Sequence, residues 1–259
     1  MCGISGIISH KYPKDLPISL MVNSQQHRGP DYSNYEINNQ VALGHNRLKI
    51  IDCSDKANQP MSNKDQTIHI VFNGEVYNFK ELKHRYFSDD LSSFNTGSDT
   101  EIVLKMYEKF GIKCLDKLNG MFAFAIHDLK NKEVFLCRDR FGIKPLFFYQ
   151  DSDYFIFSSE IKGILSSNLI EKKINKNAIS EFLFYGNTLG ENTLYNGIKK
   201  LESGHFLKFD LTTEKFYLKK YYDISTAKET KFDSEFFFCG LPPPLPRKLL
   251  VHLVSEINT

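Results

Sequence analysis

The stretch Met1-Cys2-Gly3-Ile4-Ser5-Gly6-Ile7-Ile8 places a cysteine directly behind a methionine and ahead of an apolar run. If the methionine is removed, the thiol and a free α-amine lie on one residue. An unperturbed α-amine has a pKa of about 7.7–8.0, so it can accept the thiol proton near neutral pH. This predicts Cys2 as a nucleophile that is activated by its own amine. The alternative is a small buried cysteine at the start of an apolar strand, and this stretch taken alone favours that alternative.

The composition limits the class of protein to which the chain can belong. Its 259 residues suffice for one large domain or two small ones, with hydrophobic residues at 41% and charged residues at 25%. The 33 basic and 31 acidic side chains are intermixed, which argues against a nucleic-acid partner. Five cysteines without a CxxC pair indicate reduced thiols. Because neither a signal peptide nor a long apolar run is evident, we expect a cytoplasmic protein with no membrane partner.

Hydrophobic periodicity predicts a layered α+β domain. Strands are expected at residues 3–9, 41–51, 67–72, 121–127, 133–138, 146–149, 154–158, 204–209 and 215–221. Helices are expected at residues 15–26, 159–165, 175–185 and 248–257, and behind a capping box formed by Ser98 and Glu101, where the helix stops at Gly111. The dipeptide Asn73-Gly74 is expected to form a turn at the end of its strand.

Five further residues match what a thiol needs to attack the amide of an amino acid. Asn73 and Gly74 offer an amide group and an unhindered N–H for a developing oxyanion. Arg47 has the fork-shaped cation that suits an α-carboxylate, and Asp99 or Glu75 can accept an α-ammonium group. Taken one at a time, these residues are equally well explained as a simple turn, surface groups or helix caps. The eight histidines show no ligand spacing, so no metal site is predicted.

Eight stretches, in order along the chain, together resemble one family, the glutaminase domain of asparagine synthetase. They are Cys2-Gly3-Ile4 with Gly6, residues 27–31 (HRGPD), 44–52 (GHNRLKIID), 72–78 (FNGEVYN), 96–101 (TGSDTE), 119–124 (NGMFAF), 138–146 (RDRFGIKPL) and 157–163 (FSSEIKG). The resemblance covers about residues 2–224. Its family is the class II, or N-terminal nucleophile, glutamine amidotransferases.

The resemblance implies a fold, a reaction and a set of site residues. The fold is a four-layer αββα sandwich of the N-terminal nucleophile hydrolase type. Mature Cys2 is the nucleophile, its α-amine is the general base through a water, and Asn73 and Gly74 form the oxyanion hole. L-Glutamine is held by Arg47, by the backbone of Leu48, Lys49, Ile50 and Ile51, and by Asn73, Gly74, Glu75 and Asp99. The products are glutamate and ammonia, released through a thioester on Cys2.

Related branches of this class fit the motifs less well. Amidotransferases of glucosamine-6-phosphate and purine synthesis resemble the N-terminus but carry different residues around the arginine and the oxyanion asparagine. The combination HRGPD, RLKIID and NGEVYN indicates the asparagine-synthetase branch. That branch also holds β-lactam-forming enzymes and amidotransferases of surface-polysaccharide pathways, which stay open as alternatives. A different class of function, a catalytically idle remnant that acts as a binding module, also stays open.

The resemblance ends before the second half of the family. No SGGxDS loop and no GxxxxGK[ST] sequence is present. We therefore expect an amidotransferase domain at residues 2–212, a connector at 213–235 toward a missing synthetase domain, and an aberrant Pro-rich tail at 236–259. A truncated or frame-shifted reading explains that tail, with a polyproline interaction segment as the alternative.

The glutaminase step needs no cofactor, since ATP and Mg belong to the missing synthetase domain. The resemblance implies that a synthetase domain, or a subunit in trans, is the partner that receives the ammonia. A homodimer stays open.

Overall fold

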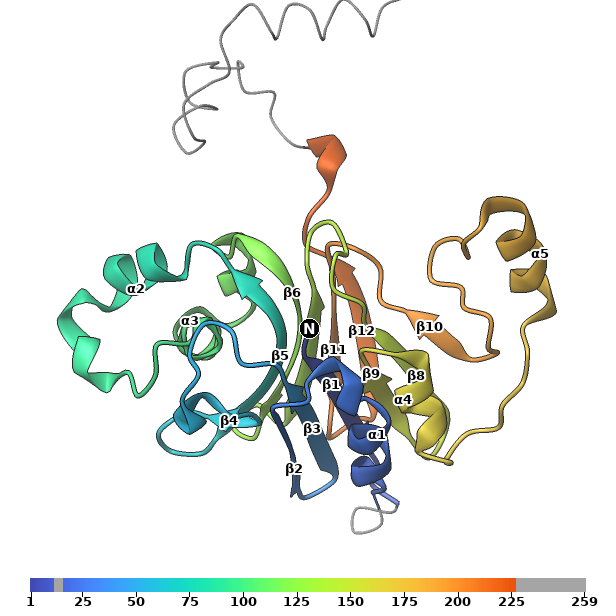
Figure 1. The fold of residues 1–259 in the computed structure, drawn as a ribbon, viewed down its shortest axis with the longest axis horizontal. Coiled ribbons are helices and arrows are strands. Elements are labelled where there is room, and N and C mark those ends of the chain that lie inside the picture. Colours follow the sequence, from blue (N-terminus) through green and yellow to red (C-terminus); the bar gives the residue numbers. More distant parts are fainter. Residues whose placement is uncertain (12–15, 227–259) are drawn as a thin grey trace, which may run out of the picture. The chain divides into compact units, whose positions relative to one another are not determined.

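Two six-stranded antiparallel sheets form the centre of the fold (Figure 1). The computed structural model describes residues 1–11 and 16–226. The chain divides into two units, Met1–Asp223 and Ile224–Thr259. Both sheets and the five α-helices found in the described residues belong to the first unit, and the described part of the second is the short 3-10 helix η5 (Ile224–Thr226).

The order of the strands differs from their order along the chain in both sheets. The first sheet, called sheet A, has the order β10 (Ile198–Lys200), β8 (Phe147–Gln150), β9 (Phe155–Ser158), β1 (Gly3–Ile8), β3 (Val41–Arg47) and β2 (Tyr32–Asn38). Sheet B has the order β12 (Lys215–Lys220), β11 (His205–Asp210), β7 (Glu133–Arg138), β6 (Gly120–Asp128), β5 (Ile68–Val76) and β4 (Met61–Ser62). The strand that follows Cys2 is therefore central, with a neighbour on each side.

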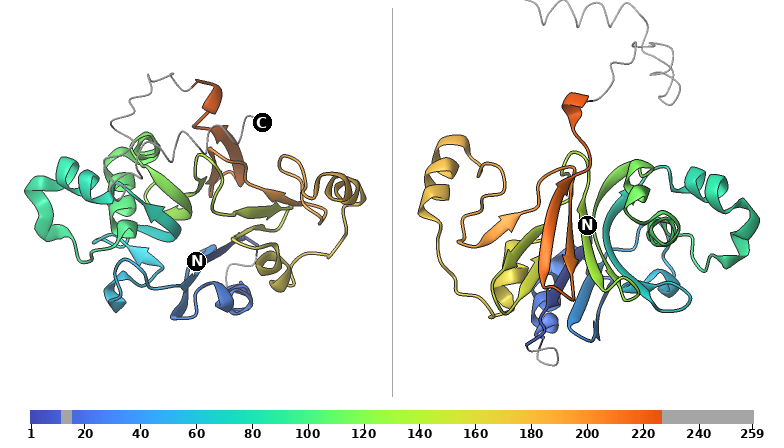
Figure 2. Two further views of the ribbon diagram at one scale, coloured as in Figure 1. Left: turned by 45° about the horizontal axis from the view of Figure 1, so that its top comes forward. Right: turned by 180° about the vertical axis from the view of Figure 1, so that it is seen from behind.

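Helices cover the outer face of each sheet, as Figures 1 and 2 show from different sides. The helices α2 (Phe79–Phe87) and α3 (Asp99–Phe110) lie beside sheet B, and α1 (Ile18–Ser24) and α4 (Ile161–Ser166) lie beside sheet A. The helix α5 (Lys176–Tyr185) lies apart from these layers. Short 3-10 helices fill the connections: η1 (Gln26–Arg28), η2 (Asp55–Ala57), η3 (Ser88–Ser93) and η4 (Gly111–Asp116). The four-layer αββα sandwich is confirmed.

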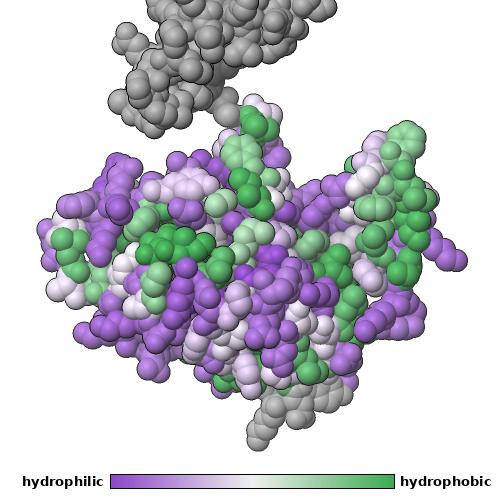
Figure 3. Space-filling view, in the orientation of Figure 1, coloured by the Kyte–Doolittle hydropathy of each residue, from purple (hydrophilic) through white to green (hydrophobic). Residues whose placement is uncertain are grey.

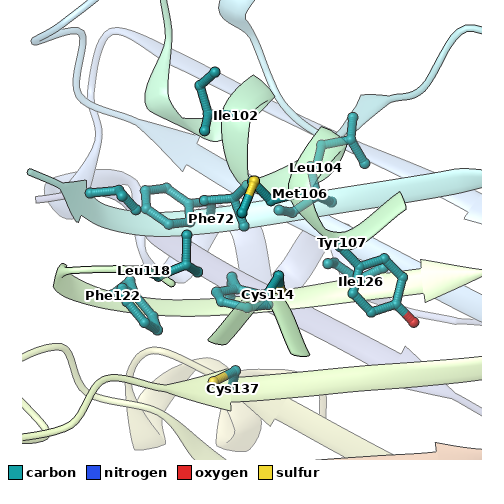
Figure 4. Close-up of a cluster of buried hydrophobic side chains, with 14 of the residues drawn as sticks. Phe72, Ile102, Leu104, Met106, Tyr107, Cys114, Leu118, Phe122, Ile126 and Cys137 are labelled. Carbon is teal, nitrogen blue, oxygen red and sulfur yellow. The ribbon is translucent and has the colours of Figure 1, made fainter. Parts of the chain in front are cut away.

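Side chains that alternate between the two faces of each strand form three apolar layers. One lies between the two sheets, and one lies between each sheet and its helices. On β5, Ile70 and Phe72 face α3, whereas Val71 faces sheet A. On β6, Phe124 likewise packs toward α3 while Ala123 lies between the sheets. Figure 4 shows side chains of α3 packed against those of β5 and β6. A period of two therefore sorts each strand into an inner and an outer face, as strand geometry requires.

Most of the predicted elements are confirmed within the described residues. Examples are β7, the β11–β12 hairpin, and α3, which begins behind Ser98 and ends before Gly111. The capping box is only half correct. The Ser98 hydroxyl accepts from the Thr100 N–H at 3.1 Å, but the Glu101 carboxylate accepts from the Asn95 and Thr96 N–H groups of the preceding loop. The helix predicted at residues 248–257 and the tail at 236–259 lie outside the described residues.

The turn predicted at Asn73-Gly74 is wrong. The strand β5 continues through both residues to Val76, and they pair with Ala123 and Phe122 of β6. The glycine is needed there because a Cβ at position 74 would lie 2.3 Å from the Met121 carbonyl oxygen. Pairing with a long neighbouring strand therefore overrides the local turn tendency of the dipeptide.

Among the strands and α-helices, four elements were missed: β2, α2 and the short strands β4 and β10. The sequence of β2 is polar, and the strand is mostly exposed, so its period is hard to recognise. In α2 only Leu82 is fully buried, which leaves the apolar face of the helix narrow. Weak burial thus explains the weak sequence signal of both.

The boundary between domain and connector stays a prediction. The first unit extends to Asp223, and β12 is an edge strand of sheet B although it lies in the segment assigned to the connector.

Candidate active site

One cavity brings together the ends of β1 and β3, the strand β5 and the start of α3. Nine of the ten residues that the sequence assigns to the site line it: Cys2, Arg47, Leu48, Ile50, Ile51, Asn73, Gly74, Glu75 and Asp99. The tenth, Lys49, points elsewhere, since its ammonium donates to Asp55 at 2.9 Å and its N–H to Asp31 at 2.8 Å. The fold therefore places the candidate residues in one site, while their individual roles stay predictions.

The Cys2 thiol lies at the end of β1 against the loop that follows β3. Its Sγ accepts from the Leu48 N–H at 3.4 Å and lies 3.8 Å from the Leu48 carbonyl oxygen. Burial raises the pKa of the thiol above its usual value, although the Leu48 N–H and the Arg47 charge act in the opposite direction. A thiol in this position needs a base to form the thiolate at neutral pH.

The backbone of Cys2 is held by residues of the HRGPD and FSSEIKG motifs. The Arg28 guanidinium donates from Nε to the Cys2 carbonyl at 2.9 Å and from a terminal nitrogen to Glu160 at 2.9 Å. His27 adds a second contact to Glu160 at 3.0 Å. Both motifs thus hold the backbone of Cys2, with His27 in a structural hydrogen-bonding role.

The other half of the HRGPD motif orders the end of β3. Gly29 approaches this strand so closely that a Cβ would lie 2.3 Å from the Asn46 carbonyl carbon. The Asp31 N–H donates to the Arg47 carbonyl at 3.1 Å, and the Asp31 carboxylate accepts from the Lys49 N–H. The motif therefore joins Cys2 to the arginine that borders the same cavity.

The backbone of Phe72, the residue before Asn73, is held by two buried side chains. His45 Nε2 donates to the Phe72 carbonyl at 3.1 Å, and the Phe72 N–H donates to the Gln59 side-chain oxygen at 2.6 Å. Burial lowers the pKa of His45 to about 4, so its ring is neutral at pH 7. His45 therefore has a structural hydrogen-bonding role.

The Asn73 side chain carries an unused donor. Asn73 is 1% exposed and lines the cavity together with Cys2. Within the described part of the chain its Nδ2 is buried and has no hydrogen-bond partner. A buried unpaired donor is costly, and native structures hold few of them outside strained or functional positions. The amide is therefore available to an oxygen atom placed in the cavity.

Arg47 is already engaged by the loop that it borders. Its guanidinium donates to the Ser54 carbonyl at 2.8 Å, to the Asn58 side chain at 2.6 Å and to the Asp52 carbonyl. These bonds shape residues 48–58 into one wall of the cavity, to which Leu48, Ile50 and Ile51 contribute. A direct bond between Arg47 and a substrate carboxylate stays a prediction.

Asp99 forms the acidic end of the cavity, at the first turn of α3. Its carboxylate accepts from the Val76 N–H at 2.9 Å, and only 4% of the residue is exposed. Burial raises the pKa of Asp99 to about 6, even though backbone N–H groups act in the opposite direction. Glu75, whose charge also raises this pKa, lines the same cavity. Two carboxylates in one pocket suit a cationic group.

Comparison with known families agrees with this geometry. The family model of the glutamine amidotransferase domain matches residues 1–222. The chain belongs to the glutamine amidotransferase family. The match covers both sheets and every residue of the candidate site.

Curated relatives of this amidotransferase include asparagine synthetases. The chain is 40% identical over 245 residues to a provisionally named asparagine synthetase [glutamine-hydrolyzing] 2 of Methanocaldococcus jannaschii, covering 86% of this chain and 46% of that protein. It is 36% identical over 234 residues to asparagine synthetase [glutamine-hydrolyzing] 2 of Bacillus subtilis, covering 86% of this chain and 31% of that protein. The amidotransferase thus spans less than half the length of either relative.

A solved structure supports the fold. The glutamine phosphoribosylpyrophosphate amidotransferase of Bacillus subtilis, complexed with ADP and GMP, superposes with a TM-score of 0.62 at 19% identity, covering 85% of this chain and 49% of that chain. At this identity the similarity establishes the fold and says nothing about substrate or residue roles.

Sequence reasoning assigned no site role to Gln59, Arg28 or Lys144 of this amidotransferase. Gln59 and Lys144 line the cavity, and Arg28 holds the Cys2 carbonyl. Arg28 and Lys144 lie inside quoted motifs, so the motifs were the available signal. Gln59 lies in none, and only the tertiary structure places it beside Phe72.

No cluster of three or more metal-binding side chains exists in residues 1–11 and 16–226. Over the same residues, no helix is both long enough and apolar enough to span a membrane.

Proposed function

We propose that this amidotransferase hydrolyses L-glutamine to glutamate and ammonia through a thioester on Cys2, once Met1 has been removed. The observation that carries the proposal is the unpartnered Asn73 amide in the cavity that also holds the Cys2 thiol. A thiol and an unused donor in one cavity are the two parts that acyl transfer requires.

In the first step the Cys2 α-amine takes the thiol proton, directly or through a water. The thiolate attacks the side-chain carbonyl carbon of glutamine and forms the C–S bond. Negative charge develops on the carbonyl oxygen, where Asn73 Nδ2 and the Gly74 N–H stabilise it. The C–N bond then breaks, and the leaving nitrogen takes the proton from the ammonium to depart as ammonia.

In the second step water hydrolyses the thioester. The neutral α-amine takes a proton from water, hydroxide adds to the same carbonyl carbon, and the same donors stabilise the oxyanion. The C–S bond breaks, the thiolate regains its proton from the ammonium, and glutamate leaves. One base therefore serves both steps.

The two ends of the cavity match the two charges of the substrate backbone. Asp99 and Glu75 accept the α-ammonium group, while Arg47 and the backbone of Leu48, Lys49, Ile50 and Ile51 hold the α-carboxylate. The partly raised pKa of Asp99 fits this role, because a cationic substrate group stabilises the ionised carboxylate.

The names of the relatives suggest where the ammonia goes. We propose that it amidates aspartate in an ATP- and Mg-dependent synthetase part, in the same protein or in a partner subunit, since the chain spans less than half of these relatives. The glutaminase step itself uses no cofactor in this scheme, and we place the reaction in the cytoplasm.

The test is release of glutamate from glutamine by the purified protein, compared with the variants Cys2→Ala and Asn73→Ala. We expect no release from Cys2→Ala. We expect kcat to fall about 100-fold or more in Asn73→Ala, the usual loss for one oxyanion donor.

A mass measurement accompanies the assay, because the scheme requires that Met1 be absent from active protein. Equal release from Cys2→Ala and the unmodified protein would overturn the proposal. So would full activity in protein that retains Met1, since the nitrogen of Cys2 would then be an amide and could not act as base.

A further inference from the structure

Lys144 places a buried ammonium group beside the residue that precedes the nucleophile. The side chain belongs to the RDRFGIKPL motif, only 6% of the residue is exposed, and it lines the cavity. Its Nζ lies 3.4 Å from the Met1 sulfur. No carboxylate lies within ion-pair distance of this ammonium in the part of the chain that the structure describes.

The position of Lys144 is fixed by its backbone. Its N–H donates to the fully buried Asp139 carboxylate at 2.9 Å, and its carbonyl accepts from Arg138 at 2.7 Å. Arg138 also donates to the Leu201 carbonyl, and Asp139 also accepts from the Ile143 N–H. A surface lysine would extend its ammonium into water. Lys144 instead lines the cavity, because the loop that carries it is fixed by these backbone hydrogen bonds.

Burying a cation without a counter-ion costs free energy. Such a group in a cavity therefore points to a functional role. Removal of Met1 takes away the thioether that Lys144 contacts and leaves an α-amine on Cys2. The Met1 sulfur and the Cys2 nitrogen are five covalent bonds apart. Lys144 Nζ therefore lies within about one Debye length, roughly 10 Å at 0.1 M salt, of the new amine.

We propose that Lys144 is a positioning residue that keeps the α-amine of mature Cys2 in its neutral, proton-accepting form. The inference rests on the proposed function, in which this amine is the base. A nearby positive charge disfavours a second one, so the lysine lowers the proton affinity of the amine. The amine can then act at a pH at which an unperturbed α-amine is mostly protonated.

Several other charges lie around the amine. Arg28 is paired with Glu160, whereas the Arg47 guanidinium is bonded to uncharged groups of the 52–58 loop and keeps its positive charge near Cys2. The carboxylate of Asp139 is occupied by backbone N–H groups. The anions Glu75 and Asp99 line the cavity and favour the protonated amine. Lys144, together with Arg47, thus opposes them.

The experiment compares Lys144→Gln and Lys144→Arg with the unmodified protein, using the pH dependence of kcat at saturating glutamine. At saturating glutamine, Asp99 is paired with the α-ammonium group of the substrate. The fall of kcat on the acidic side of the pH profile, its acidic limb, therefore reports protonation of the Cys2 amine. In Lys144→Gln we expect this limb to move about one pH unit upward, with a loss of about tenfold at pH 6.5 and recovery at pH 9. Lys144→Arg keeps the charge and should restore the original limb.

Lys130→Gln is the matched control. It removes the same charge from an exposed side chain that follows the end of β6 and does not line the cavity, so it should leave the limb in place. A uniform loss of kcat at every pH in Lys144→Gln would indicate a structural role only and would overturn the inference. An unchanged profile would overturn it as well.

A second measurement separates this inference from the proposed function. In protein labelled with ¹³C-cysteine, the Cα signal of Cys2 reports titration of the amine without any turnover. Lys144→Gln should raise the midpoint of this titration by about one pH unit, and equal midpoints would refute the role of Lys144. A raised midpoint in a protein that releases no glutamate would leave Lys144 supported and the glutaminase proposal refuted.

Discussion

At the scale of single residues, Asp99 shows how a binding site lowers the stability of the fold. Its carboxylate is buried at the start of α3, and burial raises its pKa to about 6 from the ordinary value near 3.8. The folded protein therefore binds more protons than the unfolded chain between about pH 4 and pH 6. Stability falls as the pH rises through this interval, and above it the cost of the buried charge is fully present.

We predict that Asp99→Asn is more stable than the unmodified protein at neutral pH. The amide oxygen can still accept from the Val76 N–H, and the buried charge is gone. We expect a gain of about 2 kcal/mol at pH 7.5 that shrinks toward zero at pH 4, measured by denaturant unfolding at both pH values.

The same variant should bind glutamine poorly, with kcat/KM reduced roughly 10- to 100-fold through loss of a charged partner. A variant that is less stable at pH 7.5, or one whose gain does not depend on pH, would contradict this account of Asp99.

At the scale of elements, the site depends on how closely the 27–31 segment approaches the end of β3. Gly29 lies against the Asn46 and Arg47 backbone, where no side chain fits. From this segment Arg28 reaches the Cys2 carbonyl and Asp31 accepts from the Lys49 N–H. Any displacement of the segment therefore moves Cys2 and the cavity wall together.

We predict that Gly29→Ala costs about 1–3 kcal/mol of stability, because the new Cβ would overlap backbone atoms that cannot shift independently. Glutamine hydrolysis should fall as well, since Cys2 and Arg47 lose their relative placement. Thermal unfolding and glutamate release measure the two effects.

Gly97→Ala is the matched control, because the only atom near its Cβ is an Asp52 oxygen at 3.7 Å. We expect it to change stability by less than about 0.5 kcal/mol. Equal losses in the two variants would show that the close approach of Gly29 is not the cause.

At the scale of the whole domain, apolar side chains are not confined to the three buried layers. Figure 3 shows an apolar surface over α5. Leu183 is 78% exposed and Phe184 is 80% exposed, whereas Ala178 is the one fully buried residue of this helix. These exposed side chains contribute little to the stability of the isolated chain.

We predict that the double variant Leu183→Gln, Phe184→Gln unfolds within about 1 kcal/mol of the unmodified protein, since neither side chain leaves a buried layer. Its solubility should rise because the apolar patch is reduced. Calorimetry and the concentration at which precipitation begins are the measurements. A large loss of stability would show that α5 packs more tightly than its exposure indicates.

Much of the chemistry could be predicted from the sequence because it lies in short motifs. Cys2 behind a methionine, the Asn73-Gly74 pair, Arg47 and Asp99 are single residues whose side-chain types limit what they can do. The strands were predictable for a related reason. Alternation at period two reports which face of a strand is buried, and that pattern is local.

Only the tertiary structure decided how these pieces meet. Asn73-Gly74 is a strand rather than a turn because β6 pairs with it, and Gln59 and His45 clamp Phe72 from distant parts of the chain. The ammonium group of Lys144 contacts the Met1 side chain, which is far away in sequence. Local periodicity encodes burial but not the identity of the neighbour. Long-range packing decides that the Asn73 side-chain amide nitrogen has no partner among the described residues. It also decides that the Lys144 ammonium group lies near the N-terminus.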